Sequence, residues 1–326
     1  MNGRLAGRIA RIAVAAALTG YLLWRSDPAA VAAAAQHADG SWILAAVLLV
    51  LIDRALMAWR WALLLCIVDE RMRPPVGRIL EVFFVSTFVG TFLPASIGSD
   101  AVRAYSISRK GATDGVDGAD AVASVFMDRM LGVGSLLIMG VVGLAFARNL
   151  AANGVVLAGL GLTAAVSVLT MLMIFSERVG AWCARVADVM PFAVLRRMGR
   201  AIIESVQRYA RFHWQLLNVL AASVGVQVLR IVQAYCLGRS LGIDAGGTIY
   251  LAFVPIILLI MLLPVTINGL GTSQAAFVWF FGGIGVESAP AFALSVLFVA
   301  LGMVGNLPGG LLYAMKGLSP ARGSAR

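Results

Sequence analysis

Long apolar runs separated by basic segments are the feature that most limits how this chain can fold. Several of them approach or exceed the roughly 18 residues that indicate a membrane span. Of the 326 residues, 60% are hydrophobic and only 13% are charged, which is not typical of a soluble domain of this size. The sequence therefore predicts an all-α integral membrane protein. The runs are Ile9–Trp24, Trp42–Cys66, Ile79–Leu93, Ala121–Ala147, Val155–Phe175, Trp214–Leu237, Thr248–Phe281 and Ala291–Met315.

The positive charge of the chain is explained by its membrane location. The net charge is +10, but most of the arginines lie between the apolar runs, where we expect them to act as topology signals and to contact lipid headgroups. We therefore expect no nucleic-acid partner. The cysteines and histidines show no metal-ligand spacing, and no GxSxG, HExxH or P-loop motif occurs. We expect no metal, no cofactor and no catalytic residues.

The N-terminal segment allows two interpretations. Arg4, Arg8 and Arg11 precede the first apolar run, and Ala32–Gln36 contains an A-x-A pattern, as in a signal peptide. That pattern lies well beyond the end of the apolar run, however. We therefore interpret the run as the first membrane span.

Two apolar runs are interrupted in the same way. The segment FLPASIGSDAVRAYSIS covers Phe92–Ser108, and LLPVTINGLGTSQAAFV covers Leu262–Val278. In each, proline removes a backbone donor and glycine permits unusual dihedral angles, which leaves backbone polar groups unpaired at membrane depth. Such backbone must be buried in protein or line a wet cavity. The alternative is that Pro94 and Pro264 are simple kinks in ordinary spans.

The distribution of basic residues indicates that both broken segments are re-entrant hairpins. Basic residues flank Ile79–Ser108 on both sides, so both of its ends are expected in the cytoplasm. Its first arm, Ile79–Leu93, reaches only about 22 Å into a hydrocarbon core about 30 Å thick. The basic segment Arg178–Arg211, which we expect to lie on anionic lipid as a surface helix, and the basic C-terminal tail then place both ends of Thr248–Phe281 outside.

These assignments predict one membrane domain, residues 1–326, built from an inverted-topology repeat. Residues 1–150 and 151–326 form the two halves, with about six full spans and two hairpins in total. RALMAW at Arg54–Trp59 echoes RIVQAY at Arg230–Tyr235 at similar depth. We expect a multi-pass protein of the cytoplasmic membrane with both termini in the cytoplasm.

The candidate site residues come from the two breaks and from the intramembrane charges. Paired Pro/Gly-interrupted segments point to a transport site. We expect Ser99 to cap the helix that follows the first break, and Thr272 or Ser273 to cap the helix that follows the second, where helix N-termini attract anions. An intramembrane arginine costs about 2.5–3.5 kcal/mol and is usually turned inward for a function. The substrate-binding candidates are Arg54, Pro94, Gly98, Ser99, Asp100, Arg103, Asp128, Arg129, Arg230, Pro264, Asn268, Gly269, Gly271 and Thr272.

Several of these charges have a simpler explanation as ion pairs that only hold helices together. The spacing of Asp100 and Arg103 lets them share a helix face. Adjacent residues such as Asp128 and Arg129 point apart and are expected to pair with other segments. For Arg60, the favoured interpretation is a side chain that extends toward the cytoplasmic interface.

The chain resembles the membrane domain of the lysylphosphatidylglycerol synthase/flippase-like family, the membrane part of multiple peptide resistance factors. The matching segments are DRALMAWRWALLL (Asp53–Leu65), LPASIGSDAVRAYSISRKG (Leu93–Gly111), DRMLGVG (Asp128–Gly134), LLPVTINGLGTSQAAFVWFFGGIGV (Leu262–Val286) and GNLPGGLLY (Gly305–Tyr313). The resemblance implies a polytopic protein with paired re-entrant segments that moves or handles lipids. Many members have Arg-Glu after the position of Gly271, where this chain has Ser273-Gln274. The aminoacyl-transfer domain of the full synthases is also missing, so we expect a non-enzyme.

Two functions follow as expectations. The first is a lipid translocase that moves a phospholipid or lipid-linked carrier with an anionic headgroup. The second is a non-catalytic membrane subunit that anchors or regulates a lipid- or glycan-modifying enzyme. An intramembrane enzyme that uses Asp53, Asp100 or Asp128 has no paired catalytic pattern to support it.

Overall fold

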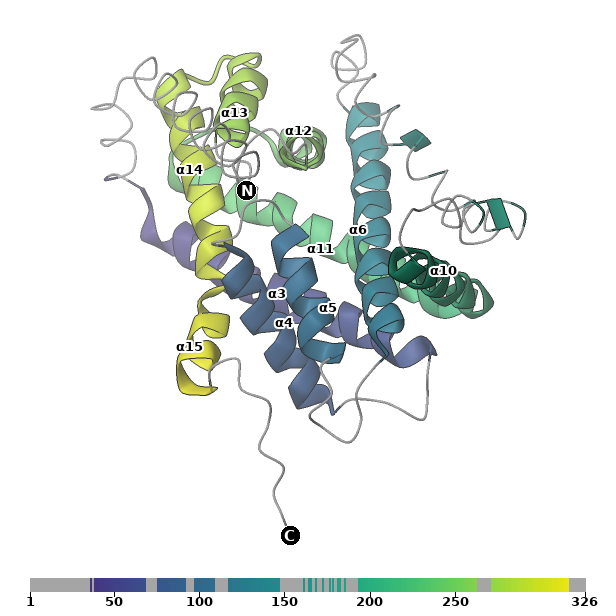
Figure 1. The fold of residues 1–326 in the computed structure, drawn as a ribbon. Coiled ribbons are helices and arrows are strands. Elements are labelled where there is room, and N and C mark those ends of the chain that lie inside the picture. Colours follow the sequence, from purple (N-terminus) through teal and green to yellow (C-terminus); the bar gives the residue numbers. More distant parts are fainter. Residues whose placement is uncertain are drawn as a thin grey trace, which may run out of the picture.

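The computed structural model describes residues 38–68, 75–91, 97–108, 117–146, 193–262 and 271–316, with residue 36 and scattered positions between 161 and 185. All regular secondary structure in these residues is helical. Two of the long helices, Gly40–Val68 and His213–Ser240, lie side by side (Figure 1). The elements are α3 (Gly40–Val68), α4 (Val76–Thr91), α5 (Ile97–Ser108), α6 (Gly118–Phe146), α10 (Ala193–Arg208), η1 (Tyr209–Phe212), α11 (His213–Ser240), α12 (Gly247–Met261), α13 (Thr272–Gly282), α14 (Ser288–Val304) and α15 (Leu307–Lys316).

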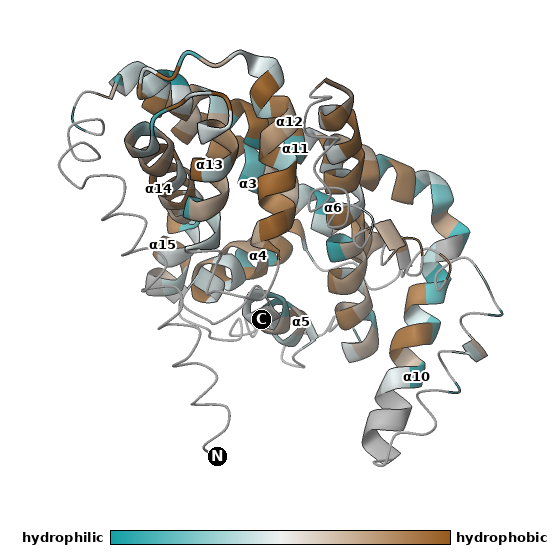
Figure 2. Cartoon of the chain, turned by 90° about the horizontal axis from the view of Figure 1, so that it is seen from above, coloured by the Kyte–Doolittle hydropathy of each residue, from teal (hydrophilic) through white to brown (hydrophobic). Residues whose placement is uncertain are grey.

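Four helices of the described residues are long and apolar enough to cross a membrane. They are Gly40–Ile67, Gly118–Phe146, His213–Ser240 and Ser288–Tyr313, and each coincides with a predicted apolar run. Apolar residues predominate along them (Figure 2). The run Ile9–Trp24 and most of Val155–Phe175 lie outside the described residues, so the total of about six spans remains a prediction.

Both interrupted segments form pairs of short helices. α4 is followed by α5, and the two pack against each other; α12 and α13 do the same in the second half. The connections, residues 92–96 and 263–270, lie outside the described residues, and with them Pro94, Pro264, Asn268 and Gly269. At 16 and 15 residues, α4 and α12 extend about 24 Å, short of the roughly 30 Å hydrocarbon core.

Packing crosses between the two halves of the chain. The long helices α3 and α11 contact each other extensively, α12 packs on α6, and α15 packs on α4. Glycines make the last two contacts possible: a Cβ on Gly143 would lie 2.7 Å from the Ala252 Cα, and one on Gly309 would overlap the Phe84 carbonyl. Small residues permit this close approach where helices pack in a membrane.

The largest hydrophobic cluster lies where α12, α13 and α14 meet α11. Its centre is aromatic: the Tyr250 and Phe281 rings are 5.2 Å apart, and Phe277 stacks on Phe281 at 5.8 Å. The second hairpin is therefore held by apolar packing. The first hairpin depends on charges, as described below.

The amphipathic helix α10 and the short η1 join the first half through α6 and α3. Arg208 forms an ion pair with Asp120, and the Tyr209 hydroxyl donates a hydrogen bond of 3.1 Å to the Leu64 carbonyl. Burial raises the pKa of Tyr209 above its usual value. The hydroxyl therefore stays protonated and keeps its role as donor.

Candidate functional site

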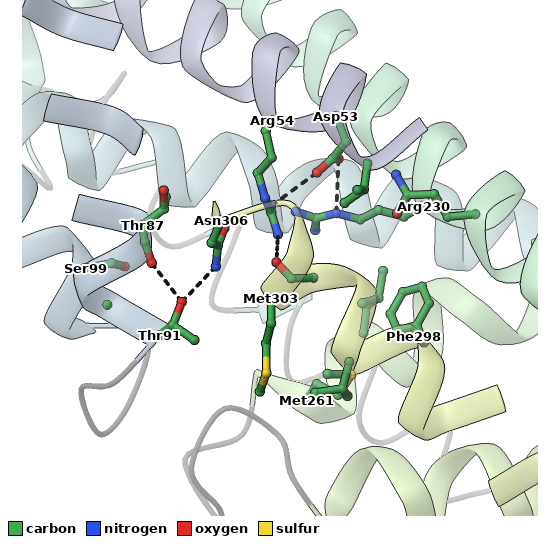
Figure 3. A pocket seen from close by; sticks show the side chains of 16 residues that line it. Asp53, Arg54, Thr87, Thr91, Ser99, Arg230, Met261, Phe298, Met303 and Asn306 are labelled. Atoms are coloured by element: carbon green, nitrogen blue, oxygen red, sulfur yellow. Dashed lines mark hydrogen bonds and ion pairs between the residues drawn. The ribbon is translucent and has the colours of Figure 1, made fainter. Parts of the chain in front are cut away.

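A cavity of about 290 Å³ lies between the two broken segments (Figure 3). Helices of both halves form its walls, including the ends of α4 and α12 that lead into the breaks and the first turn of α5. We call it the Arg54 cavity. Its lining residues are Val50, Asp53, Arg54, Thr87, Gly90, Thr91, Ser99, Arg230, Gln233, Leu258, Met261, Phe298, Val299, Gly302, Met303 and Asn306.

One aspartate in this cavity faces two arginines. Asp53 on α3 is 1% exposed. Its Oδ2 lies 3.2 Å from Arg54 Nη1, and its Oδ1 lies 3.4 Å from Arg230 Nε on α11. A single carboxylate cannot neutralise two guanidinium groups, so this cluster, which we call the Asp53 cluster, carries an excess positive charge.

Small residues on the last span make room for Arg54. Its Nη2 donates a hydrogen bond of 3.2 Å to the Gly302 carbonyl. A Cβ added to Gly305 would lie 3.1 Å from Arg54 Nε, tighter than an ordinary contact. These glycines therefore let a long charged side chain lie between α3 and α14 inside the protein.

Hydroxyl and amide groups cover the opposite wall of the Arg54 cavity. Asn306 Nδ2 donates to Thr91 Oγ1 at 2.9 Å, and Thr91 Oγ1 donates to the Thr87 carbonyl at 3.1 Å (Figure 3). This chain of bonds joins the end of α4 to the turn between α14 and α15. It connects the broken segment of the first half to the last span of the second.

The two arms of the first hairpin approach closely where they face this cavity. A Cβ on Gly90 would overlap Ser99, so glycine is required for the contact. Ser99 was expected to cap α5, but the helix begins at Ile97 and Ser99 lies in its first turn, as does Gly98. Both residues therefore lie beside the break.

The second break ends in a glycine cap. Gly271 has φ 85°, a conformation that favours glycine, and precedes the first residue of α13, Thr272. The expectation that Thr272 or Ser273 caps this helix is therefore wrong. The Gly271 N–H instead donates to Gln274 Oε1 at 2.5 Å. The uncharged Ser273-Gln274 pair, which is fully buried, thus has a structural role at the helix start.

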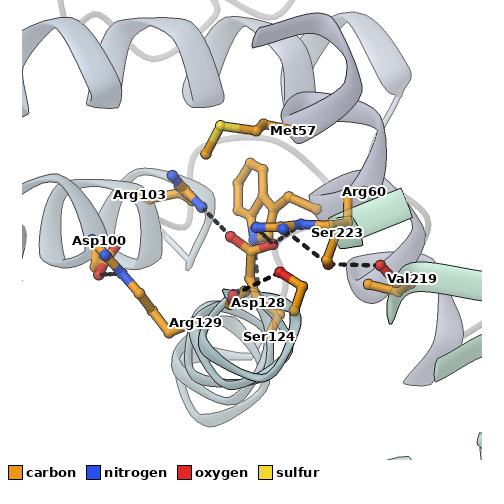
Figure 4. A network of polar contacts seen from close by, with 12 residues as sticks. Met57, Arg60, Asp100, Arg103, Ser124, Asp128, Arg129, Val219 and Ser223 are labelled. Atoms are coloured by element: carbon orange, nitrogen blue, oxygen red, sulfur yellow. Dashed lines mark hydrogen bonds and ion pairs between the residues drawn. The ribbon is translucent and has the colours of Figure 1, made fainter. Parts of the chain in front are cut away.

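A second group of charges, which we call the Asp128 cluster, lies nearby (Figure 4). Asp128 Oδ1 accepts from Arg60 Nε at 2.7 Å, and Oδ2 accepts from Arg103 Nη1 at 3.1 Å. Arg60 also donates to Ser223 Oγ at 2.9 Å. The cluster joins α3, α5, α6 and α11, and its charged members are at most 4% exposed.

Aromatic rings supply further partners for Arg103. Its guanidinium carbon lies 5.1 Å from the Trp61 ring centre and 4.7 Å from that of Phe83. Both distances are in the range of cation–π attraction. The ring faces therefore compensate part of the excess positive charge of the Asp128 cluster.

The Asp128 cluster corrects one prediction. Arg60 does not extend toward an interface; it is buried because Asp128 and Ser223 satisfy it inside the protein. Asp100 and Arg103 both face α6, in agreement with the helix face that their spacing lets them share, and each pairs with a residue of α6. Asp100 Oδ2 lies 2.6 Å from Arg129 Nε, and Arg103 binds Asp128. The prediction that adjacent charged residues pair with other segments is confirmed for Asp128, which among the described residues binds Arg60 and Arg103 and does not bind its neighbour Arg129. It is wrong for Arg54, which contacts its neighbour Asp53.

A smaller cavity of about 160 Å³ adjoins the Asp128 cluster. It shares the lining residues Thr87, Ser99 and Arg230 with the Arg54 cavity. Of the predicted site residues within the described part of the chain, most line one of the two cavities. They are Arg54, Ser99, Asp100, Arg103, Asp128, Arg129 and Arg230.

Sequence reasoning missed several polar residues of the site. Thr87 belongs to an apolar run and gave no signal. Gln233 and Asn306 lie within two quoted motifs, RIVQAY and GNLPGGLLY, but nothing in a motif shows which way a side chain points. Gln227 lines the smaller cavity, where its Nε2 donates to Ser135 Oγ at 3.1 Å.

Comparison with known proteins identifies the family of the chain. Residues 8–309 match the family model described as the lysylphosphatidylglycerol synthase TM region. No curated protein and no solved structure matches the chain. The match covers nearly the whole sequence and agrees with the apolar helices of the fold. The chain is a membrane protein and belongs to the lysylphosphatidylglycerol synthase TM region family.

Proposed function

We propose that this protein is a lipid translocase that moves a lipid with an anionic headgroup across the cytoplasmic membrane. The observation that carries the proposal is the Arg54 cavity: a space lined by apolar, hydroxyl and charged groups, with an excess positive charge among the described residues and with walls from both broken segments. Positive charge at membrane depth is costly without a partner, and it commonly marks a substrate pathway. The family name, which refers to the synthesis of a phospholipid, points to lipids as the substrate class.

The order and length of the helices support an inverted repeat. Each half has a long helix, two short helices and another span: α3, α4, α5 and α6, then α11, α12, α13 and α14. The packing is reciprocal, since α12 lies on the last span of the first half and α15, which continues the last span of the second half, lies on α4. Repeats of this kind place the substrate site at the interface between halves, near the bilayer midplane.

In the proposed mechanism, the headgroup enters the Arg54 cavity while the acyl chains stay in the surrounding lipid. Arg54 and Arg230 bind the phosphate by charge-assisted hydrogen bonds, and Thr87, Thr91 and Asn306 contact the uncharged part of the headgroup. Rocking of the halves about the α3–α11 contact exposes the cavity to one leaflet and then to the other. The sequence has no ATP-binding motif, so net transport depends on an ion gradient or on the lipid gradient itself.

The Asp128 cluster has a supporting role in this mechanism. It fixes α5 to α3, α6 and α11 through one buried carboxylate. The Asp100–Arg129 pair adds a second link between α5 and α6. The first hairpin is therefore held as a rigid wall of the Arg54 cavity.

One observation favours the alternative function, a membrane subunit of a lipid-modifying enzyme. α10 has the sequence AVLRRMGRAIIESVQR, which is strongly amphipathic and rich in arginine, and it packs on α6. Such a helix lies at the membrane surface and is able to bind either anionic lipid or a partner protein. This function predicts co-purification of an enzyme through α10 and no lipid movement by the isolated chain.

Lipid movement in proteoliposomes tests the proposal. The purified full chain is reconstituted with headgroup-labelled phosphatidylglycerol, and the label that reaches the outer leaflet is quenched with a membrane-impermeant reagent. We expect movement that falls at least about tenfold in Arg54→Ala and Arg230→Ala, the scale of one lost charged hydrogen bond. Arg239→Ala is the matched control, because Arg239 pairs with the exposed Asp244 and lines neither cavity. Equal rates in all three variants would remove the proposed site.

A further inference from the structure

We infer that the cavities select a headgroup phosphate with two negative charges, a phosphomonoester or a diphosphate, over a monoanionic or cationic headgroup. This inference names the substrate class of the translocase proposed above and rests on that function. The observation behind it is the balance of charge in the two adjoining cavities. Their linings contain five arginines and three aspartates: Arg54, Arg60, Arg103, Arg129 and Arg230, and Asp53, Asp100 and Asp128.

The excess positive charge comes from the Asp53 cluster and the Asp128 cluster. Asp100 and Arg129 form a balanced pair at 2.6 Å. The other two aspartates each face two arginines, so each of these clusters retains one positive charge. The undescribed connections beside the cavities, residues 92–96 and 263–270, contain no charged residue in the sequence. Neither connection therefore brings the missing negative charge.

The two excess charges act on one space. The Arg54 cavity and the smaller cavity share Thr87, Ser99 and Arg230 in their linings. Electrostatic attraction is stronger inside a protein than in water, because the effective dielectric constant is lower. A dianion bound between Arg54 and Arg230 is therefore stabilised by both clusters, whereas a monoanion leaves one charge uncompensated.

Buried donors without partners point to the same ligand. Arg54 Nε, Arg103 Nε and Gln233 Nε2 have no hydrogen-bond partner among the described residues, and neither do three acceptors in the cavity linings, Asp53 Oδ1, Gln227 Oε1 and Asn306 Oδ1. Arg103 and Gln233 are each 3% exposed. A buried donor or acceptor left unsatisfied destabilises the protein. A phosphate oxygen is an acceptor for the donors, and a hydroxyl group of the headgroup is a donor for the acceptors.

The same cavities disfavour a headgroup that carries an amino-acid ammonium group. The carboxylates that such a group requires already face arginines: Asp53 and Asp128 each lie within ion-pair distance of two, and Asp100 contacts Arg129. Among the described residues, Asp53 Oδ1 makes no hydrogen bond, but the charge of Asp53 is shared between Arg54 and Arg230. An added positive charge would increase the repulsion. At the start of α13, Ser273 and Gln274 supply no charge either.

Lipid binding to the purified full chain, measured by native mass spectrometry, tests the preference. The probes share the same acyl chains: phosphatidate, phosphatidylglycerol and lysyl-phosphatidylglycerol. At pH 8 we expect phosphatidate to bind about tenfold more tightly than phosphatidylglycerol, the effect of one further charged hydrogen bond. Near pH 5.5 this ratio should narrow, because the second ionisation of a phosphomonoester has a pKa of about 6. Equal binding of the two anionic lipids at pH 8, or tighter binding of the lysyl lipid, would overturn the inference.

A competition experiment distinguishes a lipid from a free phosphate. Glycerol phosphate carries the same dianion without acyl chains, so we expect it to displace phosphatidate only at far higher concentration. Displacement at equal concentrations would identify a soluble phosphate compound as the ligand and overturn the assignment to a lipid.

Variants with opposite effects on charge sharpen the test. Arg54→Gln and Arg230→Gln each remove one excess charge and should reduce the ratio toward unity. Asp53→Asn increases the excess positive charge by one and should keep or raise the ratio of phosphatidate to phosphatidylglycerol affinity. Arg239→Gln removes an equal charge outside the cavities and should leave the ratio of phosphatidate to phosphatidylglycerol affinity unchanged. If this ratio instead follows the total charge of the protein in all four variants, the cavities are not the binding site.

Failure of this inference can be told apart from failure of the proposed function. If phosphatidate and phosphatidylglycerol both cross the bilayer at the same rate and bind with the same affinity, the proposed translocase function stands and the inferred preference for a dianion is wrong. If phosphatidate binds preferentially but no lipid crosses, the anion preference stands and the translocase is wrong.

Discussion

The Asp53 and Asp128 clusters have the same composition, one aspartate and two arginines, but different surroundings. The charged members of the Asp128 cluster are nearly inaccessible, and Ser223, Trp61 and Phe83 supply them with further partners. In the Asp53 cluster, the Arg54 and Arg230 side chains remain 14% and 23% exposed and line the larger cavity. An intramembrane ion cluster by itself therefore does not mark a binding site. The Asp53 cluster differs because its arginines stay partly exposed in the larger cavity, whereas the Asp128 cluster borders only the smaller of the two cavities and is nearly inaccessible.

The largest expected effect on stability comes from disrupting the Asp128 cluster. Asp128→Ala leaves Arg60 and Arg103 buried without their carboxylate, and removing one partner from a buried pair costs about 3–5 kcal/mol. We expect a large fall in unfolding temperature in detergent, with loss of folded protein on gel filtration. Asp244→Asn, which removes an exposed carboxylate from its pair with Arg239, is the control. A small effect of Asp128→Ala would show that the cluster does not hold the hairpin.

Removing the carboxylate of the Asp53 cluster should lower the free energy of unfolding by a smaller amount. In Asp53→Ala, the two arginines lose a partner but border a cavity that admits water, which lowers the penalty toward about 1–3 kcal/mol. The measurement is the same thermal unfolding, compared with Asp128→Ala in one detergent. Equal losses in the two variants would contradict the difference between closed and open surroundings.

Ser223 offers a finer test of the Asp128 cluster. Ser223→Ala removes one hydroxyl acceptor from Arg60, while the bonds from Arg60 to Asp128 remain. We expect a loss of about 1.5–3 kcal/mol, the value of a hydrogen bond to a charged group. Ser295→Ala is the control, because among the described residues the Ser295 hydroxyl donates only to the Phe292 carbonyl in its own helix.

The smallest effect on stability is expected for Arg54→Gln. Asp53 keeps Arg230 at 3.4 Å, and the change removes a positive charge from a cluster that has one in excess, while the bond from Arg54 to the Gly302 carbonyl is lost. We expect a change of about 1 kcal/mol or less in unfolding free energy, the size of a typical net hydrogen bond. The same variant should lose lipid binding. A variant that keeps lipid binding but unfolds easily would make Arg54 a structural residue.

The sequence predicted the helical membrane fold and most of the charged site residues for reasons that are local. Apolar runs, proline and glycine mark spans and breaks without reference to the rest of the chain, and an arginine within a run must turn inward. The partners were harder to predict. Arg60 pairs with Asp128 and Ser223, which are 68 and 163 positions away, and helix periodicity cannot show such contacts.

The caps of the broken helices also escaped prediction. Serine and threonine are good caps, and both Ser99 and Thr272 lie close to helix starts. The chain uses Gly271 instead, because its φ of 85° allows a turn that other residues resist, and Gln274 supplies the acceptor. Asn306 and Gln233 joined the site only because α11 and α14 pack beside α3.

Photocrosslinking is the most direct test of the claim that the Arg54 cavity receives a lipid headgroup. Phosphatidate with a photoreactive group next to its phosphate is incubated with the full chain in nanodiscs, irradiated and mapped by mass spectrometry. We predict adducts on the cavity residues Met261 and Phe298, and their loss in Arg54→Gln but not in Arg239→Gln. Adducts confined to outward-facing residues such as Leu44 and Trp279, and unaffected by Arg54→Gln, would contradict the account.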